Sequence, residues 1–588
     1  MKWVLAECDE KAAAVLTRDA GVHPLIARLL VNRGVVDPAA ARSFLNCDLS
    51  LLSSPAVFAG MERATARIRK AVEGREQIVV YGDYDVDGVT GSALLYLVLK
   101  RLNAGVDGYI PDRMTEGYGL NRGALERLKT SGAGLVITVD CGISAVDEAE
   151  TARSLGLDLI ITDHHEIGSS SRSNKENGPN GSNGLILPDA LSILHPWLLL
   201  PEVSPEVRDQ VSGLTGVGVA FKLAQALLGL DACDAGMRPY LDLVTLGTVA
   251  DVGRIMGENR VLVRHGLELL SRQDGSLRPG IAALKQVTGL NGKKISAGTV
   301  GFTLGPRINA SGRLERADMA FRLLTTASGD EARELAEALD GVNRERQDVE
   351  ERIQEEARKL CLKQDPAGTG AFVLASRDWH PGVIGIVASR IVEEFYRPTA
   401  LICVKDGIGK GSARSIPGFD LYHGLLQCRD LLLGFGGHKY AAGFSLSEDK
   451  IVPFRERLDA IVLETLGKEG FLRTQLVDGA VPLDELTLEL LSEIDKLAPF
   501  GQGNPEPRLG ARGLQVLSSR IVGGNHLKLR LKRESGTSLD AIAFKRGDLL
   551  GRIVRDGARV AVVFTPRVNA WNGSMSVELE IKDLKPDK

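Results

Sequence analysis

The sequence predicts an α/β protein in which two α/β units are joined by a long helix and followed by a small β-barrel. From residue 78, short apolar runs alternate with segments of helical periodicity, which is typical of a parallel sheet covered by helices on both faces. A second α/β pattern occupies residues 370–465, and short alternating strands from about 470 onward indicate the barrel. The length of 588 residues agrees with about three or four domains.

The first 70 residues are expected to form an amphipathic helical segment ahead of the first α/β unit. That unit, residues 71–325, contains three continuous apolar runs, Ile78–Tyr81, Leu135–Val139 and Leu159–Thr162. The intervening segments TGSALLYLVLKRL, NRGALERLK and SAVDEAETARSL have helical periodicity. Apolar strands separated by helices predict a parallel sheet buried on both faces.

Residues 168–184, GSSSRSNKENGPNGSNG, interrupt this pattern with serine, asparagine and glycine and have no apolar periodicity. We interpret the segment as a dispensable surface insertion, because this composition cannot repay the entropy of ordering. The alternative is a lid that closes on a ligand. The segment offers only Arg172 and Lys175 as cations and no aromatic residue, which argues against a lid.

A long charged helix is expected over residues 329–363, within a linking region of residues 326–365. One face of it carries an apolar stripe at spacings of three, four and seven residues, which suits a helix that joins two domains. The alternative is a peripheral helix packed on one domain. The stripe is formed by Leu335, Leu339, Val342, Val349 and Ile353.

The remaining chain divides into a second α/β unit, residues 366–466, and a barrel domain, residues 467–588. Between residues 512 and 588 there are 15 lysines and arginines against 8 acidic residues, a net charge of +7. This local charge suits nucleic acid, and Phe544, Phe564 and Trp571 are candidate stacking faces. The alternative is a basic β-domain without a ligand.

Overall composition does not announce a nucleic-acid-binding protein, since the net charge is −4 and the pI is about 6.2. No run of 18 or more apolar residues suggests a membrane span, and the first residues, MKWVLAECDE, lack the apolar core of a signal peptide. The seven cysteines show no CxxC spacing, which favours reduced thiols. We therefore expect a cytoplasmic protein without a membrane partner.

Acidic and histidine residues follow each of the three predicted strands. They are the loop Gly82–Gly88, GDYDVDG, then Asp140-Cys141-Gly142, then Asp163-His164-His165. Ligands of open α/β sheets bind at the carboxyl ends of the strands, so these side chains should meet at one rim. Asp251, in LGTVADVGR, is a fourth candidate from a later helix–loop junction.

These residue types predict a metal site. Asp83, Asp85 and Asp87 repel one another unless a cation neutralises them, and carboxylates combined with imidazoles suit Mn²⁺, Mg²⁺ or Fe²⁺. Two ions about 3.5–4 Å apart can activate water and clamp both oxygens of an in-line displacement. Asp140 is the natural bridge between them, because it stands alone at the end of a central strand.

Two other interpretations of these residues remain open. The loop could be a solvated turn, with His164 and His165 capping a helix. The loop also loosely resembles an EF-hand, but position twelve counted from Asp83 is Leu94 where an EF-hand has glutamate.

The three motifs together resemble the DHH phosphoesterase superfamily. Many members have a histidine four residues before the Asp-x-Asp pair, where this chain has Tyr81. By the superfamily's spacing, Asp85 and Asp87 are the preferred ligands, and Asp83 is a candidate replacement for the missing histidine. The resemblance thus implies a metal set of Asp83, Asp85, Asp87, Asp140, His164, His165 and Asp251, with Asp140, His164 and His165 catalytic.

Motifs in the second half narrow the resemblance to the RecJ exonucleases. HPGVIG at residues 380–385, GSARS at 411–415 and GGH at 436–438 are similar to the accessory, DHHA1-type domain that follows DHH domains. LAPFGQGNP at residues 497–505 resembles the entry to the family's oligonucleotide-binding (OB-fold) barrel. The similarity extends from about residue 60 to 588.

The RecJ resemblance implies a 5′→3′ exonuclease for single-stranded DNA that acts in repair and recombination and depends on two divalent cations, Mn²⁺ or Mg²⁺. It also implies a monomer, with a single-strand-binding protein and a helicase as candidate partners. A glycine-led loop with serine and arginine suits a terminal phosphate, although the alternative for any one arginine is a surface ion pair. The implied substrate ligands are Arg113, Arg307, Arg313, His380, Ser412, Arg414, Gly436, Gly437 and His438.

Two other functions are the alternatives. A cyclic-dinucleotide or oligonucleotide phosphodiesterase of the same superfamily would need no extended binding track, which the basic barrel provides. A DNA-binding scaffold with an inactive site would lack metal ligands, and apart from Tyr81 the set is present.

Overall fold

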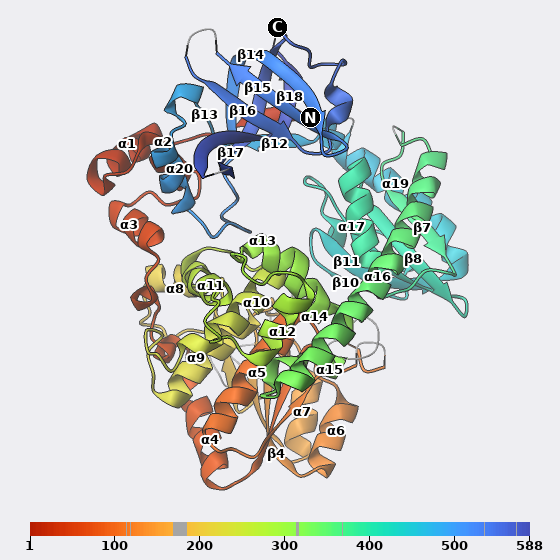
Figure 1. The fold of residues 1–588 in the computed structure, drawn as a ribbon. Helices are drawn as coiled ribbons and strands as arrows, with labels where there is room; N and C mark the ends of the chain where they lie inside the picture. The colour runs from red at the N-terminus through yellow and green to blue at the C-terminus, as the bar shows by residue number, and fades with distance from the viewer. Residues whose placement is uncertain are drawn as a thin grey trace.

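The computed structural model describes residues 1–112, 115–117, 119–168, 185–312, 317–366, 368–467, 469–533, 536–571 and 573–587. Figure 1 shows the parallel sheet and its helices below, the accessory domain to the right, the barrel at the top and the first helices to the left. Residues 169–184 of the predicted insertion lie outside the described residues, so its dispensability stays a prediction.

The predicted parallel sheet is confirmed. Its strand order is β3-β2-β4-β5-β6, and every pair of neighbours is parallel. The three predicted strands are the central ones; the short β6 was not predicted. The strands are β2 (Gln77–Gly82), β3 (Val106–Tyr109), β4 (Ala133–Val139), β5 (Asp158–Thr162) and β6 (Ser192–Leu194).

Helices cover both faces of this sheet, because successive residues of each strand point to opposite sides. Ile78 and Val80 of β2 pack with α4 (Met61–Glu73), α5 (Val86–Arg101) and α9 (Gly216–Leu228). Val79 and Tyr81 pack with α6 (Arg122–Thr130) and α7 (Val146–Ser154) on the other face. The predicted boundary at residue 70 therefore falls inside α4, a helix of the sheet's own core.

A helical layer completes the first domain. It packs into the same core as α5 and α9. Between its short helix α13 (Ala297–Thr299) and α14 (Gly305–Ser311), Val300–Leu304 forms a π-helical turn. The other helices are α8 (Pro205–Val211), α10 (Leu241–Ala250), α11 (Gly257–Leu270), α12 (Pro279–Val287) and α15 (Ala317–Thr325).

The predicted linking helix is α16, Gly329–Lys363, 35 residues long. Near its start, Leu335 and Leu339 belong to the core of the first domain. Near its end, Ile353 and Cys361 belong to the core of the accessory domain. The helix thus joins two domains, and the alternative of a helix packed on one domain is wrong.

The accessory domain is α/β, as predicted, with a mixed sheet in the order β10-β11-β9-β8-β7. Only β7 and β8 are parallel, and β10 is an edge strand. Its strands are β7 (Phe372–Ser376), β8 (Thr399–Lys405), β9 (Ile408–Arg414), β10 (Gly434–Gly437) and β11 (Ala441–Ser447), and its helices are α17 (Ile384–Phe395), α18 (Leu421–Leu426) and α19 (Ile451–Leu466).

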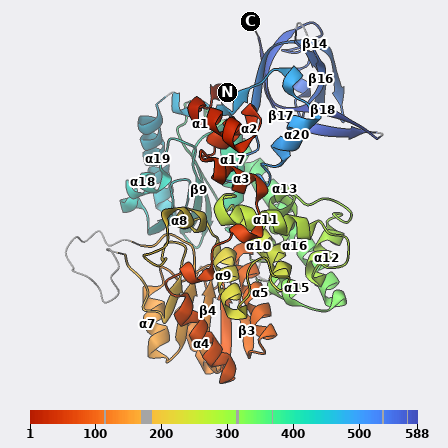
Figure 2. The same ribbon diagram turned by 90° about the vertical axis from the view of Figure 1, so that its left-hand side faces the viewer.

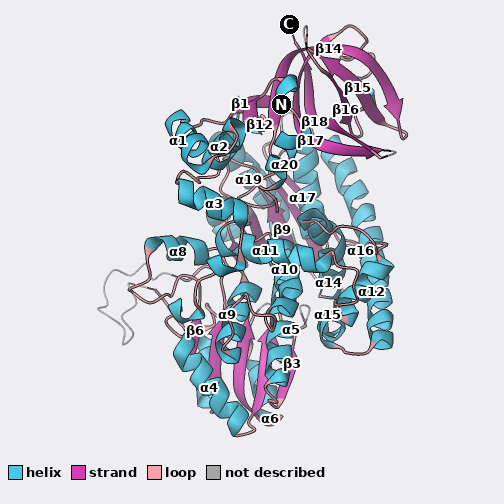
Figure 3. Ribbon diagram, turned by 60° about the vertical axis from the view of Figure 1, so that its left-hand side comes forward, coloured by secondary structure: helices cyan, strands magenta, loops and turns pink. Residues whose placement is uncertain are grey.

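The predicted C-terminal barrel is confirmed, and the strands gathered at the top of Figure 3 belong to it. The sheet order is β13-β14-β15-β16-β18-β17, and pairing of β14 with β17 closes it. The helix α20 (Leu488–Asp495) packs on β17. The strands are β13 (Gly479–Ala480), β14 (Leu509–Val522), β15 (His526–Lys532), β16 (Ser538–Ala543), β17 (Arg559–Trp571) and β18 (Ser574–Pro586).

One candidate stacking face in the barrel is wrong. Phe564 is fully buried in the barrel core, because β17 turns alternate side chains inward and an aromatic ring contributes a large buried surface there. Phe544 is 52% exposed and forms an edge-to-face pair with His526. The side chain of Trp571 lies outside what the structure describes.

The N-terminal segment is not helical throughout. Residues Lys2–Leu5 form β1, which pairs in parallel with β12 (Thr474–Val477) ahead of the barrel. The helices α1 (Glu10–Val15), α2 (Pro24–Val31) and α3 (Pro38–Asn46) then share the barrel's core, and Figure 2 shows them beneath it. A four-residue strand is too short to show a pattern, and its partner lies far along the chain.

Within the described residues, no single helix has the length and apolar character needed to cross a membrane. The helices α8 and α9 meet those criteria only when taken together, and they are bent by 116° relative to each other.

Candidate metal centre and substrate site

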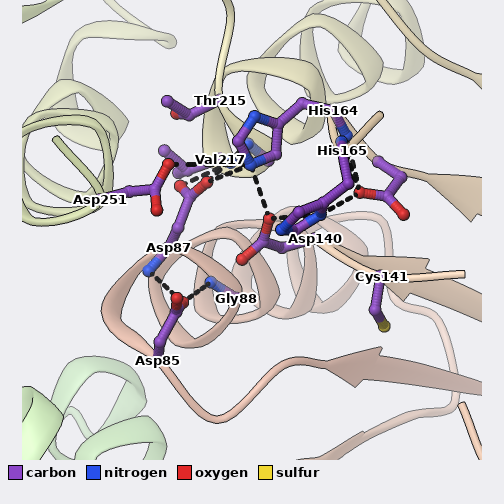
Figure 4. Close-up of polar contacts among 12 residues, drawn as sticks. Asp85, Asp87, Gly88, Asp140, Cys141, His164, His165, Thr215, Val217 and Asp251 are labelled. Carbon is purple, nitrogen blue, oxygen red and sulfur yellow. Dashed lines mark hydrogen bonds and ion pairs between the residues drawn. The ribbon is translucent and has the colours of Figure 1, made fainter. Parts of the chain in front are cut away.

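All seven predicted metal ligands gather at the carboxyl ends of β2, β4 and β5. Figure 4 labels all of them except Asp83. Their ligand atoms form three overlapping groups, and within each group the atoms lie within 4.8 Å of one another. His164 and Asp140 each belong to two groups. The groups are Asp140/His164/His165, Asp87/His164/Asp251 and Asp83/Asp85/Asp140.

The two preferred aspartates of the GDYDVDG loop have different local roles. Asp85 is the N-cap of α5, and its side chain accepts hydrogen bonds from the backbone N–H of Asp87 (2.9 Å) and Gly88 (3.1 Å). Asp87 is fully buried and accepts from the N–H of Gly216 (2.6 Å) and Val217 (2.9 Å), at the first turn of α9. The positive end of that helix favours a carboxylate at this point. Because α5 begins at Val86, the loop is a strand–helix junction and not an EF-hand.

Asp140 is buried and occupies the left-handed region, with φ of 62°. Its Oδ1 lies 3.0 Å from Nε2 of His164, yet neither buried atom makes a hydrogen bond within the described residues. Leaving buried polar atoms without partners is costly, and a cation between them would satisfy both. The donor set therefore fits a divalent ion.

The backbone of Gly216 lies against the side chain of Asp140. A Cβ atom at Gly216 would lie only 2.6 Å from Cβ of Asp140. Only glycine can occupy this position while its N–H also donates to Asp87. The first turn of α9 thus positions both Asp140 and Asp87.

The carboxylates crowd one another strongly enough to shift their proton affinities. Burial and the charge of Asp85 raise the pKa of Asp87 to about 7. Burial and the charges of Asp87 and Asp85 raise the pKa of Asp251 to about 9, and the same causes raise the pKa of Asp140. The ionised carboxylates of such a cluster are stable together only when bound cations neutralise their charge.

The two histidines differ. Burial, together with the neighbouring His165, lowers the pKa of His164 to about 4, so its ring is neutral and suited to ligating a metal. Burial alone would lower the pKa of His165, but a hydrogen bond to Asp163 and the nearby carboxylates of Asp251 and Asp85 raise that pKa to about 9. Nδ1 of His165 lies 2.7 Å from Oδ1 of Asp163.

Asp163 and His195 are residues that the sequence prediction missed. The buried Asp163 carboxylate accepts hydrogen bonds from the N–H of Ile143 (2.8 Å) and His164 (2.7 Å), so it orients the histidine pair. His195 is buried and its Nε2 lies 2.8 Å from the carbonyl of His165. Asp163 stood in the motif itself, whereas nothing in the sequence near His195 signalled this contact.

Tyr81, which departs from the superfamily's histidine, lies on the opposite face of the sheet. Its hydroxyl donates to the carbonyl of Gly119 (3.0 Å), accepts from Nδ2 of Asn121 (3.1 Å), and its ring stacks on Tyr109. The position therefore holds part of the core. Asp83 instead lies with Asp85 and Asp140.

Ser412 and Arg414 lie on β9 of the accessory domain. Nη1 of Arg414 donates to Oγ of Ser412 (3.2 Å) and to the carbonyl of Ala413 (2.9 Å). A Cβ at Gly385, in the first turn of α17, would lie 3.0 Å from Oγ of Ser412 and 3.1 Å from Nη2 of Arg414. A hydroxyl, a guanidinium and a helix start thus meet, a combination suited to phosphate.

The glycine–histidine motif connects the accessory domain to the metal centre. Nδ1 of His438 lies 3.6 Å from Oε2 of Glu166, the residue that follows His165. Gly436 and Gly437 end the edge strand β10 just before it. His380 lies ahead of α17, where its Nδ1 accepts from the N–H of Gly382 (3.1 Å).

Of the predicted arginine ligands of the first domain, the structure describes Arg307 alone. Nε of Arg307 donates to Asp340 of α16 (2.8 Å) and Nη1 donates to the carbonyl of Thr303 (2.6 Å), so this arginine makes an ion pair, but a largely buried one and not the surface pair considered as the alternative. Arg113 and Arg313 lie outside the described residues.

The chain matches models of known domain families and several related proteins. The model of the DHH family N-terminal domain matches residues 77–248, that of the DHHA1 domain residues 368–464, and that of the RecJ OB domain residues 477–583. The single-stranded-DNA-specific exonuclease RecJ of Bacillus subtilis is 40% identical over 99% of this chain and 70% of its own length. RecJ of Escherichia coli is 34% identical over 96% of both chains.

Solved structures agree with these relatives. The crystal structure of RecJ from Thermus thermophilus in complex with Mn²⁺ superposes with a TM-score of 0.81 at 32% identity, covering 100% of this chain and 80% of that one. Its complex with Mg²⁺ gives a TM-score of 0.76 at 31% identity, covering 100% and 79%.

Proposed function

This chain belongs to the RecJ family of single-stranded-DNA-specific exonucleases, and from this premise we propose that it removes nucleotides from the 5′ end with two divalent cations, Mn²⁺ or Mg²⁺. Hydrolysis of single-stranded DNA is the family's activity and is that of this chain. The polarity, the number of ions and the residue roles are the proposal.

One ion would be held by the Asp83/Asp85/Asp140 group and the other by the Asp87/His164/Asp251 group. The observation that carries this assignment is the place of Asp140, which belongs to the first group and whose Oδ1 lies 3.0 Å from His164 of the second. Bound ions would activate water and neutralise charge on the phosphodiester.

The remaining residues would orient the substrate. Asp163 holds Nδ1 of His165, so a contact of that ring with a phosphate oxygen would go through Nε2. Ser412 and Arg414 would hold a 5′ phosphate, and His438, beside Glu166, would reach the scissile phosphate from the accessory side. Arg113, Arg307, Arg313, His380, Gly436 and Gly437 stay candidate substrate ligands.

End-labelled oligonucleotides test polarity and metal requirement together. We expect a 5′-labelled single strand to release labelled mononucleotide at once in Mn²⁺, while a 3′-labelled strand shortens stepwise. Duplex of the same sequence and reactions in EDTA should remain intact. Immediate release of a 3′ label would refute the proposed polarity without refuting the exonuclease activity.

We also propose a role in DNA repair and recombination, action as a monomer, and a single-strand-binding protein and a helicase as partners, in line with the family resemblance. All seven cysteines are described and are free thiols, which supports a reducing, cytoplasmic location. The domain limits 71–325, 326–365, 366–466 and 467–588 remain proposed functional units, and the proposed unit 1–70 shares α4 with the first of them.

A further inference from the structure

Phe302 is the most exposed large apolar side chain among the described residues, at 88%. It lies in the π-helical turn Val300–Leu304 between α13 and α14. Burying such a ring would stabilise the fold by roughly 1.5–3 kcal/mol, so an exposed one forgoes that gain. Single-turn π segments occur frequently at functional sites, which makes this position a candidate for binding.

The turn packs beside the metal centre. A Cβ at Gly305 would lie 3.1 Å from Cβ of Ala250, the last residue of α10, and Asp251 follows directly. On the next helix, α14, Oδ1 of Asn309 accepts from the N–H of Val86, which sits between Asp85 and Asp87. The Phe302 turn is thus followed directly by a helix that contacts both sides of the cluster.

A second exposed apolar residue lies between the metal centre and the barrel. Val252 is 67% exposed and has φ of 59°, a backbone conformation that β-branched residues rarely adopt. The chain then runs to Ile255, whose N–H donates to the carbonyl of Gln502 at the barrel's entry (2.7 Å). Figure 1 accordingly shows α13 at the edge of the first domain that faces the barrel.

Phe302 is flanked by residues without side chains, and two exposed lysines precede it in the sequence. The residues four before it, one before it and three after it are glycines 298, 301 and 305, so these helical neighbours place no side chain beside the ring. Lys293 and Lys294 are exposed on the loop that leads into α13. An aromatic face combined with cations is the usual means of holding a single strand.

We propose that Phe302 is a positioning residue that stacks on one unpaired base of the substrate, between the metal centre and the barrel. Bases inside a duplex already stack on their neighbours and cannot offer a face, so the contact favours single strands. The inference rests on the family's substrate and on a strand that passes from the metal centre to the barrel, but not on which residues ligate the metals or on polarity.

The test is binding in EDTA, where the strand is not cleaved. A single 2-aminopurine is placed at successive positions of a short oligonucleotide. We expect the wild-type protein to quench one position more than the others, and Phe302→Ala to abolish that difference and raise Kd roughly 5- to 100-fold. Phe302→Trp should restore both. Leu362→Ala, an exposed apolar residue near the end of α16, is the matched control and should match wild type.

Salt dependence separates stacking from charge. Because Phe302 is neutral, Phe302→Ala should leave the slope of log K against log salt unchanged, while Lys293→Ala combined with Lys294→Ala should make it shallower. A Kd and quenching profile in Phe302→Ala equal to wild type would overturn the proposal. The proposal would also be overturned if Phe302→Ala lost affinity equally for a normal strand and for a strand whose candidate base is replaced by an abasic residue. Failure of the proposed polarity or of the metal assignment would leave both readouts unaffected.

Discussion

At the scale of single residues, Asp140 combines a strained backbone conformation with a buried carboxylate. Left-handed backbone costs a non-glycine residue roughly 1–2 kcal/mol, and the residue is also buried among like charges. A position of this kind persists because the surrounding structure determines it, here through the backbone of Gly216 and the end of β4.

Asp140→Asn is predicted to lower kcat at least about 1000-fold, because it removes the charge that the two ion groups share. It should also remove most of the rise in Tm that Mn²⁺ produces, which at about 100 times Kd corresponds to about 2.7 kcal/mol for each site. Turnover is measured on a labelled strand and Tm by calorimetry. Near-normal turnover of a folded variant would rule out the shared-ligand arrangement.

Arg414→Ala is predicted to lower kcat/KM on a 5′-phosphorylated strand, because charged hydrogen bonds to the phosphate are removed. The fall should correspond to roughly 1–3 kcal/mol of lost transition-state stabilisation. The loss should be much smaller on a strand with a 5′ hydroxyl. Arg414→Lys, which keeps the charge without the planar fork, should fall between. Equal losses on both strands would show that the guanidinium does not read the terminal phosphate.

The sequence was sufficient to predict that most of the candidate metal ligands meet, because they follow β2, β4 and β5 and parallel strands end at one rim; Asp251 instead follows α10. It was insufficient for the residues that hold them. The N–H groups of Gly216 and Val217 reach Asp87 from 129 and 130 positions away, and His195 reaches His165 from 30. Contacts of this kind are created by packing between helices, which periodicity does not describe.

At the scale of elements, two helical glycines have opposite meanings. Gly216 has no room for a Cβ beside Asp140, whereas Gly341, inside α16, has nothing within 4 Å. Gly216→Ala should therefore destabilise the protein and weaken Mn²⁺ binding, while Gly341→Ala should stabilise it by roughly 0.5–1 kcal/mol through helix propensity. Denaturant unfolding and Mn²⁺ titration check both. Equal effects of the two changes would contradict the steric argument.

The barrel is predicted to supply affinity, not chemistry. Arg520 of β14 and Lys545, next to the exposed Phe544, are exposed cations. Changing both to alanine should weaken binding of single strands and reduce the salt slope by about 0.7 for each phosphate that the protein no longer neutralises, with kcat at saturation unchanged. Arg63→Ala, an exposed cation of α4, is the control. A fall in kcat without a change in slope would argue for a catalytic role.

The elements that the sequence predicted well are long or repeated: the central strands, α16 and the barrel. The elements it missed are short and depend on distant partners, as β1 depends on β12 and β6 on β5. Phe564 shows the same limit, because alternation alone did not reveal which side of β17 faces the barrel's interior.

At the scale of the whole molecule, Arg260 of α11 ties the first domain to the barrel. Its guanidinium donates to the backbone carbonyls of the four residues 496–499, which lie between β13 and β14 of the barrel, and lies against the ring of Phe44. Burial lowers its pKa only to about 10, so it stays charged at neutral pH. This one side chain joins three separate parts of the sequence.

Arg260→Met keeps an unbranched apolar side chain but removes these four hydrogen bonds. The carbonyls of Lys496 and Ala498 lose the guanidinium donor, while Asn504 still donates to those of Leu497 and Pro499. The loss should cost roughly 3–5 kcal/mol. Because these hydrogen bonds lie between domains, we expect calorimetry to resolve two unfolding transitions in the variant and a single transition in the wild type. Arg264→Met removes only a long hydrogen bond to the carbonyl of Leu45 (3.4 Å) and an ion pair with Glu268 on the same helix (3.8 Å), so this variant should unfold like the wild type. A single, uniformly lowered transition would mean that the domains are coupled elsewhere.

The pairing of β1 with β12 sets the order in which a newly made chain can finish folding. Leu5 pairs with Val477, so 472 residues (477 − 5) separate them, and a ribosome needs roughly 25–95 s to add that many at 5–20 residues per second. During that time Leu16 and Ile26 have no barrel to cover them. This segment is thus made long before its partner and stays uncovered in the meantime, so it is where a chaperone would be needed during synthesis.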